Sequence, residues 1–340
     1  MHQEHVVADH TTDHHTGGVA LDVEGLSVDI RTPNGVVRAV DSVSFGARRG
    51  ETLALLGESG CGKSMTAQAV VGLLAPVADI TEGAVRLDGT DLVTASPRKR
   101  RELAGPELAI VFQDALTALN PVYTVGYQLA EPFRIHRGMS KKAARAEAID
   151  LMARVGIPEP ETRIDAYPHQ FSGGMRQRLL IAIAVALSPA VLLADEPTTA
   201  LDVTVQAQIM KLLRDLREER DMAVVLITHD LALVAEHADR VVVMYAGNVV
   251  EQGRVADVFG DPKHPYTKGL LESVPAGAER GADLRSIGGK PPELHAIPSA
   301  CVYQDRCPMV RDICREQRPA VREVVPGHVS ACHLAEEVAR

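Results

Sequence analysis

The sequence predicts an α/β protein with a largely parallel β-sheet and helices on its faces. Short apolar segments typical of buried strands occur at Glu51–Gly57, Ala190–Pro197 and Met222–Asp230. Between them, Ser64–Leu74 and Thr204–Arg220 have the spacing of helices. Strands that alternate with helices in this way form parallel sheets, because each parallel connection needs a crossover segment.

Length and composition limit the class of protein. The 340 residues suffice for one large domain with an extension, or for two domains. The net charge of −9 argues against a general nucleic-acid binder. The longest apolar run, Leu179–Ala194, is short for a membrane span and contains Pro189, and the N-terminus lacks the apolar core of a signal peptide. We therefore expect a cytosolic chain, unless a partner holds it at a membrane, and no disulfides.

The N-terminal part divides into an arm and a β-rich segment. Residues 1–18 contain five histidines among polar residues and no apolar periodicity, which predicts a disordered arm. A metal-binding tract is the alternative. Leu21–Ile30 and Ala39–Ala47 then alternate apolar and polar residues, as β-strands do.

The remaining chain shows three further changes of pattern. Residues 114–186 are predicted to be mainly helical. Ala238–Gly253 reads as a β-hairpin that turns at Gly247 and Asn248. Beyond Asp261 the composition shifts to proline, glycine and cysteine, which marks an extension.

A glycine-rich segment between a predicted strand and a predicted helix fits the phosphate-loop pattern G-x-x-x-x-G-K-[ST]. Glycines let the backbone wrap around phosphates and direct its amides inward. We expect Lys63 to reach the β- and γ-phosphates of ATP and Ser64 to bind Mg²⁺. The alternative is a glycine turn with a chance lysine. The expected phosphate-contacting residues are Gly57, Glu58, Ser59, Gly60, Cys61, Gly62, Lys63, Ser64 and Met65.

Two carboxylates end the strand that precedes Pro197. Asp195 can support Mg²⁺ through water. Glu196 follows directly and can orient and polarise the water that attacks the γ-phosphate. An exposed acidic strand end is the alternative reading, and the phosphate loop upstream weakens it.

Four further motifs lie in the order that is characteristic of one family. Phe171–Arg178, "FSGGMRQR", resembles the signature motif of ABC-type ATPases, and Gln113, Asp202 and His229 lie in segments that resemble their Q-loop, D-loop and switch histidine. The resemblance spans roughly Leu21–Gly253. It implies an ABC-type P-loop ATPase, with a RecA-like core, an antiparallel β subdomain and a helical subdomain.

The resemblance also implies roles for these residues. Gln113 would contact ATP and Mg²⁺ and link the site to the surface that touches a permease. His229 would contact the γ-phosphate and the attacking water. The signature residues would bind the γ-phosphate of ATP held by a second ATPase subunit; they are Ser172, Gly173, Gly174 and Met175. A helix N-terminus with small residues suits this role, because it is an anion site.

The sequence departs from the family pattern in three places. Met175 stands where the family usually has glutamine, and Phe171 where it has leucine. Many members also stack the adenine on an aromatic residue well before the phosphate loop, and this chain has none there. The guanidinium plane of Arg31 or Arg38 is a candidate replacement.

The tail narrows the resemblance further. Gly260–Pro275 and Val111–Pro121 resemble the ATPases of oligopeptide and dipeptide importers, and the likeness continues to Leu334. It implies an ATPase domain at residues 19–260 and an importer-type extension at 261–340. The chain would then be the ATP-hydrolysing subunit of a peptide importer at the cytoplasmic face of the cell membrane. Its partners would be two integral-membrane permeases, a second and different ABC ATPase, and an extracytoplasmic peptide-binding protein.

Two other functions fit the same motifs. ATPases of nickel or other small-solute importers look alike. A soluble ABC ATPase of DNA repair or translation is the alternative from another class, although no coiled-coil insertion or second ATPase core is visible.

Four of the five cysteines lie in the extension, separated by five, six and seventeen residues. Common zinc fingers favour tighter C-x-x-C pairs, and four cysteines suffice for a cubane iron–sulfur cluster. The resemblance to peptide-importer ATPases implies a [4Fe–4S] cluster here; zinc and unligated thiols stay open. The expected ligands are Cys301, Cys307, Cys314 and Cys332.

Overall fold

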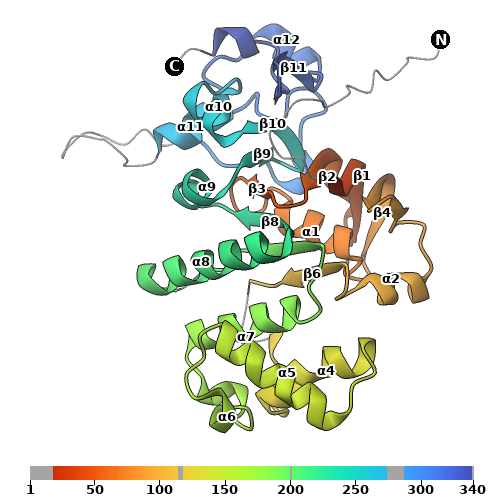
Figure 1. Ribbon diagram of the computed structural model, residues 1–340. Helices are drawn as coiled ribbons and strands as arrows, with labels where there is room; N and C mark the ends of the chain where they lie inside the picture. Colours follow the sequence, from red (N-terminus) through yellow and green to blue (C-terminus); the bar gives the residue numbers. More distant parts are fainter. Residues whose placement is uncertain (1–17, 114–117, 200, 274–286, 339–340) are drawn as a thin grey trace.

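The computed structural model describes residues 18–113, 118–199, 201–273 and 287–338. The predicted arm at residues 1–18 lies outside them, apart from Gly18. The described chain forms two sheets and a separate group of helices (Figure 1). The prediction of an α/β fold with an antiparallel β subdomain and a helical subdomain is confirmed.

The central sheet has eight strands in the order β11-β12-β10-β9-β3-β8-β7-β6. Strands β6 to β9 and β3 are paired in parallel, and β10, β12 and β11 continue the sheet in antiparallel pairs. The strands are β3 (Thr52–Leu56), β6 (Leu108–Val111), β7 (Val191–Asp195), β8 (Ala223–Thr228), β9 (Arg240–Tyr245), β10 (Asn248–Arg254), β11 (Arg322–Val325) and β12 (His328–Ser330). Strands β3, β7 and β8 are buried at every position, as expected for strands covered on both faces.

The second sheet is antiparallel and has the order β2-β1-β4-β5. Its strands are β1 (Val19–Thr32), β2 (Gly35–Arg48), β4 (Ala78–Leu87) and β5 (Thr90–Asp91). Its inward side chains share one apolar cluster with those of the central sheet, which holds both sheets against helix α1 (Lys63–Val71). Helix α1 thus begins between the two sheets, where the phosphate loop ends.

The hairpin of β9 and β10 turns one residue earlier than predicted. Tyr245 pairs with Asn248, so the two-residue loop is Ala246-Gly247. Both loop residues have positive φ, 45° and 79°. Such a loop matches the right-handed twist of the strands. The adjacent Gly247 and Asn248, both common in turns, predict a turn one residue later.

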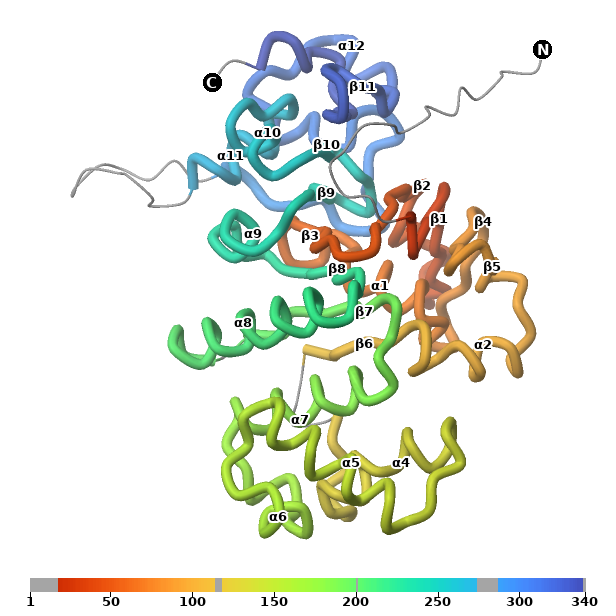
Figure 2. Tube along the Cα trace, viewed as in Figure 1, coloured from red at the N-terminus to blue at the C-terminus, as the bar shows by residue number. Residues whose placement is uncertain are grey.

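The helical subdomain lies beyond the β6 edge of the central sheet (Figures 1 and 2), and its last helix packs against β6. It contains α4 (Val125–His136), α5 (Lys141–Arg154), α6 (Pro160–Arg163), η1 (Pro168–Gln170) and α7 (Gly173–Val185). These elements have an apolar cluster of their own, and Phe171 is part of it. The aromatic ring at Phe171 therefore serves packing at the start of the signature helix.

The remaining helices cover the sheets and build the extension. Helix α8 (Val203–Arg220) packs on the central sheet through Ile209, Leu213 and Leu216. The others are α2 (Pro97–Leu103), α9 (Leu231–His237), α10 (Val255–Gly260), α11 (Pro265–Glu272), α12 (Asp312–Glu316) and the short η2 (Leu294–Ala296) and η3 (Ala335–Glu337). In the part of the chain that the structure describes, no helix combines the length and apolar character that crossing a membrane requires.

The extension is built onto the end of the central sheet. Strand β12 pairs with Glu251 and Gln252 of β10. Tyr266 and Tyr303 of the extension share an apolar cluster with Tyr245 of β9, and their rings meet edge-on or tilted. The central sheet and its core therefore continue into the extension without interruption.

Candidate nucleotide site

The phosphate loop connects β3 to α1. A Cβ on Gly57 would lie 2.3 Å from the carbonyl oxygen of Met244, and Gly62 has φ 102° at the N-cap of α1. Only glycine fits the first position, and it suits the second because L residues rarely adopt that conformation. The sequence therefore forms a tight loop at the N-terminus of a helix, where free amides attract anions.

Lys63 lies inside this loop. Its ammonium donates hydrogen bonds to the carbonyl oxygens of Gly57 (2.7 Å) and Glu58 (3.0 Å). The side chain is buried, so the loop curls around one positive charge. A group of phosphate oxygens would find both that charge and the loop amides within one concave surface.

Two of the three Mg²⁺ ligands expected from the sequence, Ser64 and Asp195, are in direct contact. The Ser64 hydroxyl donates a hydrogen bond to Asp195 at 3.1 Å. Burial raises the pKa of Asp195, the charge of Glu196 adds to this, and the bond from Ser64 opposes it. Two hard oxygen donors beside a phosphate loop match what Mg²⁺ prefers, and a cation would remove the cost of burying the carboxylate. These residues therefore fit the metal.

The Glu196 carboxylate is contacted by three other side chains of the site. Its carboxylate accepts hydrogen bonds from Gln113 Nε2 (2.6 Å) and Thr199 Oγ1 (2.9 Å), and its other oxygen lies 2.9 Å from His229 Nδ1. Burial alone would raise the pKa of Glu196, but the bonds from His229 and Thr199 hold it below its usual range. Glu196 is thus ionised and oriented. It also has φ 45°, an uncommon backbone conformation that concentrates at functional sites.

These groups line one cavity of about 1050 Å³. The phosphate loop, Gln113, Glu196, Thr199 and His229 form one part of its wall. Its other wall was not foreseen from the sequence, because it includes residues of the extension; they are Leu270, Ser273, Ile287, Pro291 and Leu294. No local pattern pointed to them, since they carry no recognisable motif.

The signature residues and the D-loop residue do not line this cavity. Ser172 caps α7 by accepting a hydrogen bond from the Met175 amide at 3.3 Å, and Asp202 caps α8 by accepting from the Val205 amide at 3.0 Å. A Cβ on Gly174 would lie 2.6 Å from the Val205 side chain, so any larger residue there would force α7 or Val205 to shift. The N-terminus of α7 is exposed and free to meet another molecule.

The two candidate stacking arginines point elsewhere. Arg31 pairs with Asp79 at 2.8 Å, and Arg38 pairs with Asp29 at 2.9 Å. Neither lines the cavity. Ion pairs with nearby carboxylates therefore hold both guanidinium groups outside the nucleotide site.

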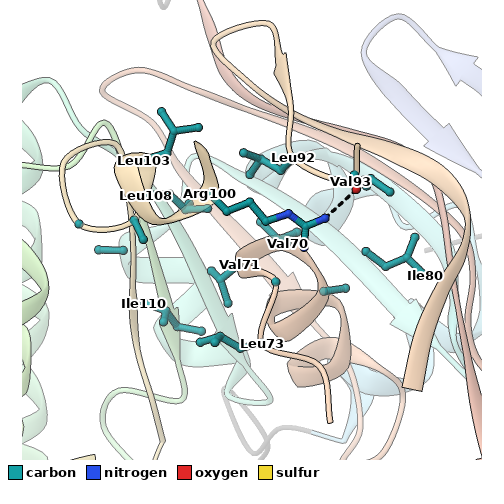
Figure 3. Close-up of a pocket in the computed structure, with 15 residues that line it drawn as sticks. Val70, Val71, Leu73, Ile80, Leu92, Val93, Arg100, Leu103, Leu108 and Ile110 are labelled. Atoms are coloured by element: carbon teal, nitrogen blue, oxygen red, sulfur yellow. Dashed lines mark hydrogen bonds between the residues drawn. The ribbon is translucent and has the colours of Figure 1, made fainter. Parts of the chain in front are cut away.

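A second, smaller cavity of about 240 Å³ lies at the opposite end of α1 (Figure 3). Its wall is mainly aliphatic, and Arg100 crosses it to donate a hydrogen bond to the Val93 carbonyl at 2.6 Å. It contains no carboxylate or glycine-rich loop to handle a triphosphate. The nucleotide is therefore assigned to the larger cavity.

The cysteines of the extension lie near one another. Burial raises the pKa of Cys332 to about 12, and the nearby thiols of Cys301, Cys307 and Cys314 contribute; the pKa of Cys307 is raised to about 11 in the same way. The Cys301 amide donates a hydrogen bond to the Cys314 carbonyl at 3.1 Å. Within the described ranges, however, no three His, Cys, Asp or Glu side chains form a group that could hold a metal ion. The four-cysteine ligand set that the family resemblance implies is therefore not assembled as a metal site there.

Cys61 lies apart from these thiols, in the phosphate loop. It is buried, and burial raises the pKa of its thiol. Unlike its neighbours in the loop, Cys61 is not among the residues that line the cavity.

A phosphate loop on a parallel sheet, an oriented glutamate and a separate helical subdomain that ends in an exposed Ser-Gly-Gly helix cap define an ATP-binding-cassette ATPase. The comparisons with known proteins agree. Residues 40–199 match the family described as ABC transporter, and residues 250–314 match the oligopeptide/dipeptide transporter C-terminal region.

Several curated proteins are similar along almost their whole length. The dipeptide transport ATP-binding protein DppD of Bacillus subtilis is 48% identical, over 93% of this chain and 95% of that protein. The protein of the same name from Escherichia coli is 47% identical, over 92% and 96%. The dimeric structure of MJ0796, a bacterial ABC transporter cassette, is 28% identical with a TM-score of 0.63, and covers 69% of this chain and 98% of its own. The chain belongs to the ABC transporter family of ATP-binding proteins and is an ATPase.

Proposed function

We propose that this chain is the ATP-hydrolysing subunit of an importer for dipeptides or oligopeptides. The supporting observation is that the segment matching the oligopeptide/dipeptide transporter C-terminal region is joined to the nucleotide site itself. The most similar proteins reported above are dipeptide transport ATP-binding proteins. Because the extension helps to form the ATP cavity, it takes part in the activity of the ATPase. Its similarity to peptide-transporter extensions is therefore relevant to the transport function.

Different residues of the site would bind the phosphates, hold Mg²⁺ and activate the attacking water. The loop amides and Lys63 hold the phosphates, and Ser64, Asp195 and Gln113 would hold Mg²⁺. When bound, Mg²⁺ neutralises phosphate charge. Glu196 orients and polarises the attacking water, while His229 keeps the Glu196 carboxylate ionised and faces the γ-phosphate.

A second ATPase subunit completes the site. Ser172, Gly173, Gly174 and Met175 form a helix N-terminus whose first two residues are exposed, and it suits the γ-phosphate of ATP bound by that partner. A pair of different ATPases, held by two permeases at the cytoplasmic face of the membrane, would close on ATP and reopen after hydrolysis. An external peptide-binding protein would deliver the substrate.

Isolation of the intact complex tests this proposal. The expected result is co-purification with two integral-membrane proteins and ATP hydrolysis that a peptide-loaded binding protein stimulates. If nickel stimulated ATP hydrolysis in place of peptide, the chain would belong to an importer of another substrate class. A complex that contains only DNA or ribosomes would remove the transport function.

The four cysteines of the extension are part of the proposal as one ligand set for an iron–sulfur cluster. Four cysteines in one small segment supply the number of thiolates that a cubane cluster takes. Their side chains would have to move closer together to bind it, since they form no metal-holding group in the described residues. A cluster would cross-link a small, polar segment that has only a minor core of its own. Elemental analysis of anaerobically purified protein should find iron and sulfide, both lost in a Cys314→Ser variant; zinc in their place, or no metal, would contradict the cluster.

A further inference from the structure

We propose that the C-terminal extension supplies the surface on which the base of the nucleotide rests. Ile287, Pro291 and Leu294 would form this surface together with Ile30 of β1. The family's usual solution, an aromatic ring from the ATPase core, is replaced by aliphatic contacts from the same chain's tail. The inference rests on the phosphate loop binding a nucleoside triphosphate.

The composition of the cavity is the first support. Once the phosphate loop and the hydrolytic residues are set aside, the described lining is almost wholly aliphatic. Ile30 and Ala39 come from β1 and β2, and most of the rest comes from the extension. No Phe, Tyr or Trp ring lines the described part of the cavity. The base must therefore pack on aliphatic side chains if it packs on the protein at all.

The direction of the nucleotide gives the second support. Lys63 and Ser64 fix the phosphates at the start of α1, and Gln113, Glu196 and His229 gather at the γ-phosphate end. The base must then point away from those residues. The part of the lining that remains is where β1 and β2 meet the extension, and η2, which begins with Leu294, packs against β2.

Arg306 links the extension to the phosphate loop beside this part of the cavity. Arg306 donates hydrogen bonds to both carboxylate oxygens of Glu58 in the phosphate loop, at 2.7 and 3.1 Å. Its Nε donates to the Gly288 carbonyl at 2.9 Å, next to Ile287. The Arg306 side chain is only 4% exposed. One arginine thus ties the base surface to the phosphate loop, so their separation is fixed.

Aliphatic contacts determine what such a surface can recognise. They bind a flat base by dispersion and by removal of water, and they offer no pattern of donors and acceptors. Among the extension residues that line the cavity and that the structure describes, only Ser273 has a polar side chain. Sites without hydrogen-bond complementarity discriminate weakly, so ATP and GTP should bind with affinities within about ten-fold of each other.

Binding of three ligands to the full-length chain tests the inference. Leu294→Asp puts a charge on the base surface, and the Mg²⁺ complexes of ATP, GTP and inorganic tripolyphosphate are the probes. The expected result is about a ten-fold loss of affinity for ATP and for GTP, with tripolyphosphate affinity unchanged. Val325→Asp on β11 is the matched control, since Leu294 and Val325 are 39% and 44% exposed.

Each other outcome contradicts the inference. Unchanged ATP affinity would show that the base does not touch this surface. An equal loss for tripolyphosphate would show that Leu294 acts through the phosphate loop, and a loss for ATP but not GTP would show that the site reads the base by hydrogen bonds. Leu294→Ser, judged by the same criteria, replaces the aspartate if that variant fails to fold. A wild-type chain that binds neither ATP nor tripolyphosphate would instead refute the phosphate site.

Discussion

Arg306 and Glu58 form a bidentate ion pair between the extension and the phosphate loop, with nitrogen–oxygen distances of 2.7 and 3.1 Å. The Arg306 guanidinium also lies over the Tyr245 ring, 5.7 Å from its centre. The Glu58 amide donates a hydrogen bond to the Tyr266 hydroxyl at 3.0 Å. Two elements of the tail therefore hold one residue of the loop that receives the phosphates.

Removing Arg306 should weaken both folding and nucleotide binding. Arg306→Ala leaves a partly buried carboxylate without its partner, and we expect a loss of about 2–3 kcal/mol in the free energy of unfolding. ATP affinity should fall as the loop loosens. Urea unfolding and equilibrium binding measure the two effects.

Arg311→Ala is the control for that experiment. Arg311 pairs with Glu337 at the surface, where both side chains are about half exposed, so its loss should cost about 0–1 kcal/mol. If Arg306→Ala proves no more harmful than Arg311→Ala, the pair with Glu58 does not stabilise the loop.

Glu196→Gln should separate hydrolysis from binding. The amide keeps the shape of the side chain but loses the charge that orients and polarises water, so we expect hydrolysis to fall by about 100-fold or more. ATP binding should stay within a few-fold of wild type. Phosphate release and equilibrium binding measure the two properties. Hydrolysis near the wild-type rate would show that another group activates the water.

Alanine at Gly174 should disturb the start of α7. Its Cβ would meet the Val205 side chain at 2.6 Å, so α7 or α8 must shift. We expect a loss of about 1–3 kcal/mol in the free energy of unfolding. Gly173→Ala is the matched control, because the same Cβ meets Leu201 at an ordinary 4.0 Å. Equal stability of the two variants in urea would show that the contact relaxes freely.

Acid should loosen the extension through His264. This side chain is buried, its Nδ1 accepts a hydrogen bond from the Tyr266 amide, and burial lowers its pKa to about 3. In the unfolded chain it would take up a proton near its ordinary pKa of 6.5. The unfolded state then binds more protons below pH 6.5, so stability falls as pH falls, by about 2 kcal/mol at pH 5.

His264→Asn isolates this effect, because asparagine can still cap α11 but does not titrate. The wild type should be the more stable protein at pH 7.5, and its advantage should shrink by about 2 kcal/mol at pH 5. Urea unfolding at both pH values measures the difference, and His295→Asn, at an exposed position, is the control. An advantage that does not change with pH would contradict the buried neutral histidine.

The sequence was sufficient where function depends on neighbours in the chain. The phosphate loop could be predicted because Gly57, Gly62 and Lys63 act through backbone conformation and a helix start that a short motif encodes. The pair of Arg306 and Glu58 could not be predicted, since 248 positions separate the two residues and only the completed sheet brings them together. The predicted position of the β9–β10 turn was wrong by one residue. The pairing register of the two strands sets that position, and local turn preferences do not determine the register.

The continuous sheet has a consequence for exchanging parts between related proteins. The two family matches, residues 40–199 and 250–314, suggest separable modules. Yet β12 pairs with β10, and the Glu251 carboxylate lies buried 2.6 Å from His328 of the tail. A chain cut after Gly260 would keep that carboxylate without its partner and expose the edge of β10. A C-terminal extension taken from a relative would therefore have to carry a strand that pairs with β10 and a partner for Glu251.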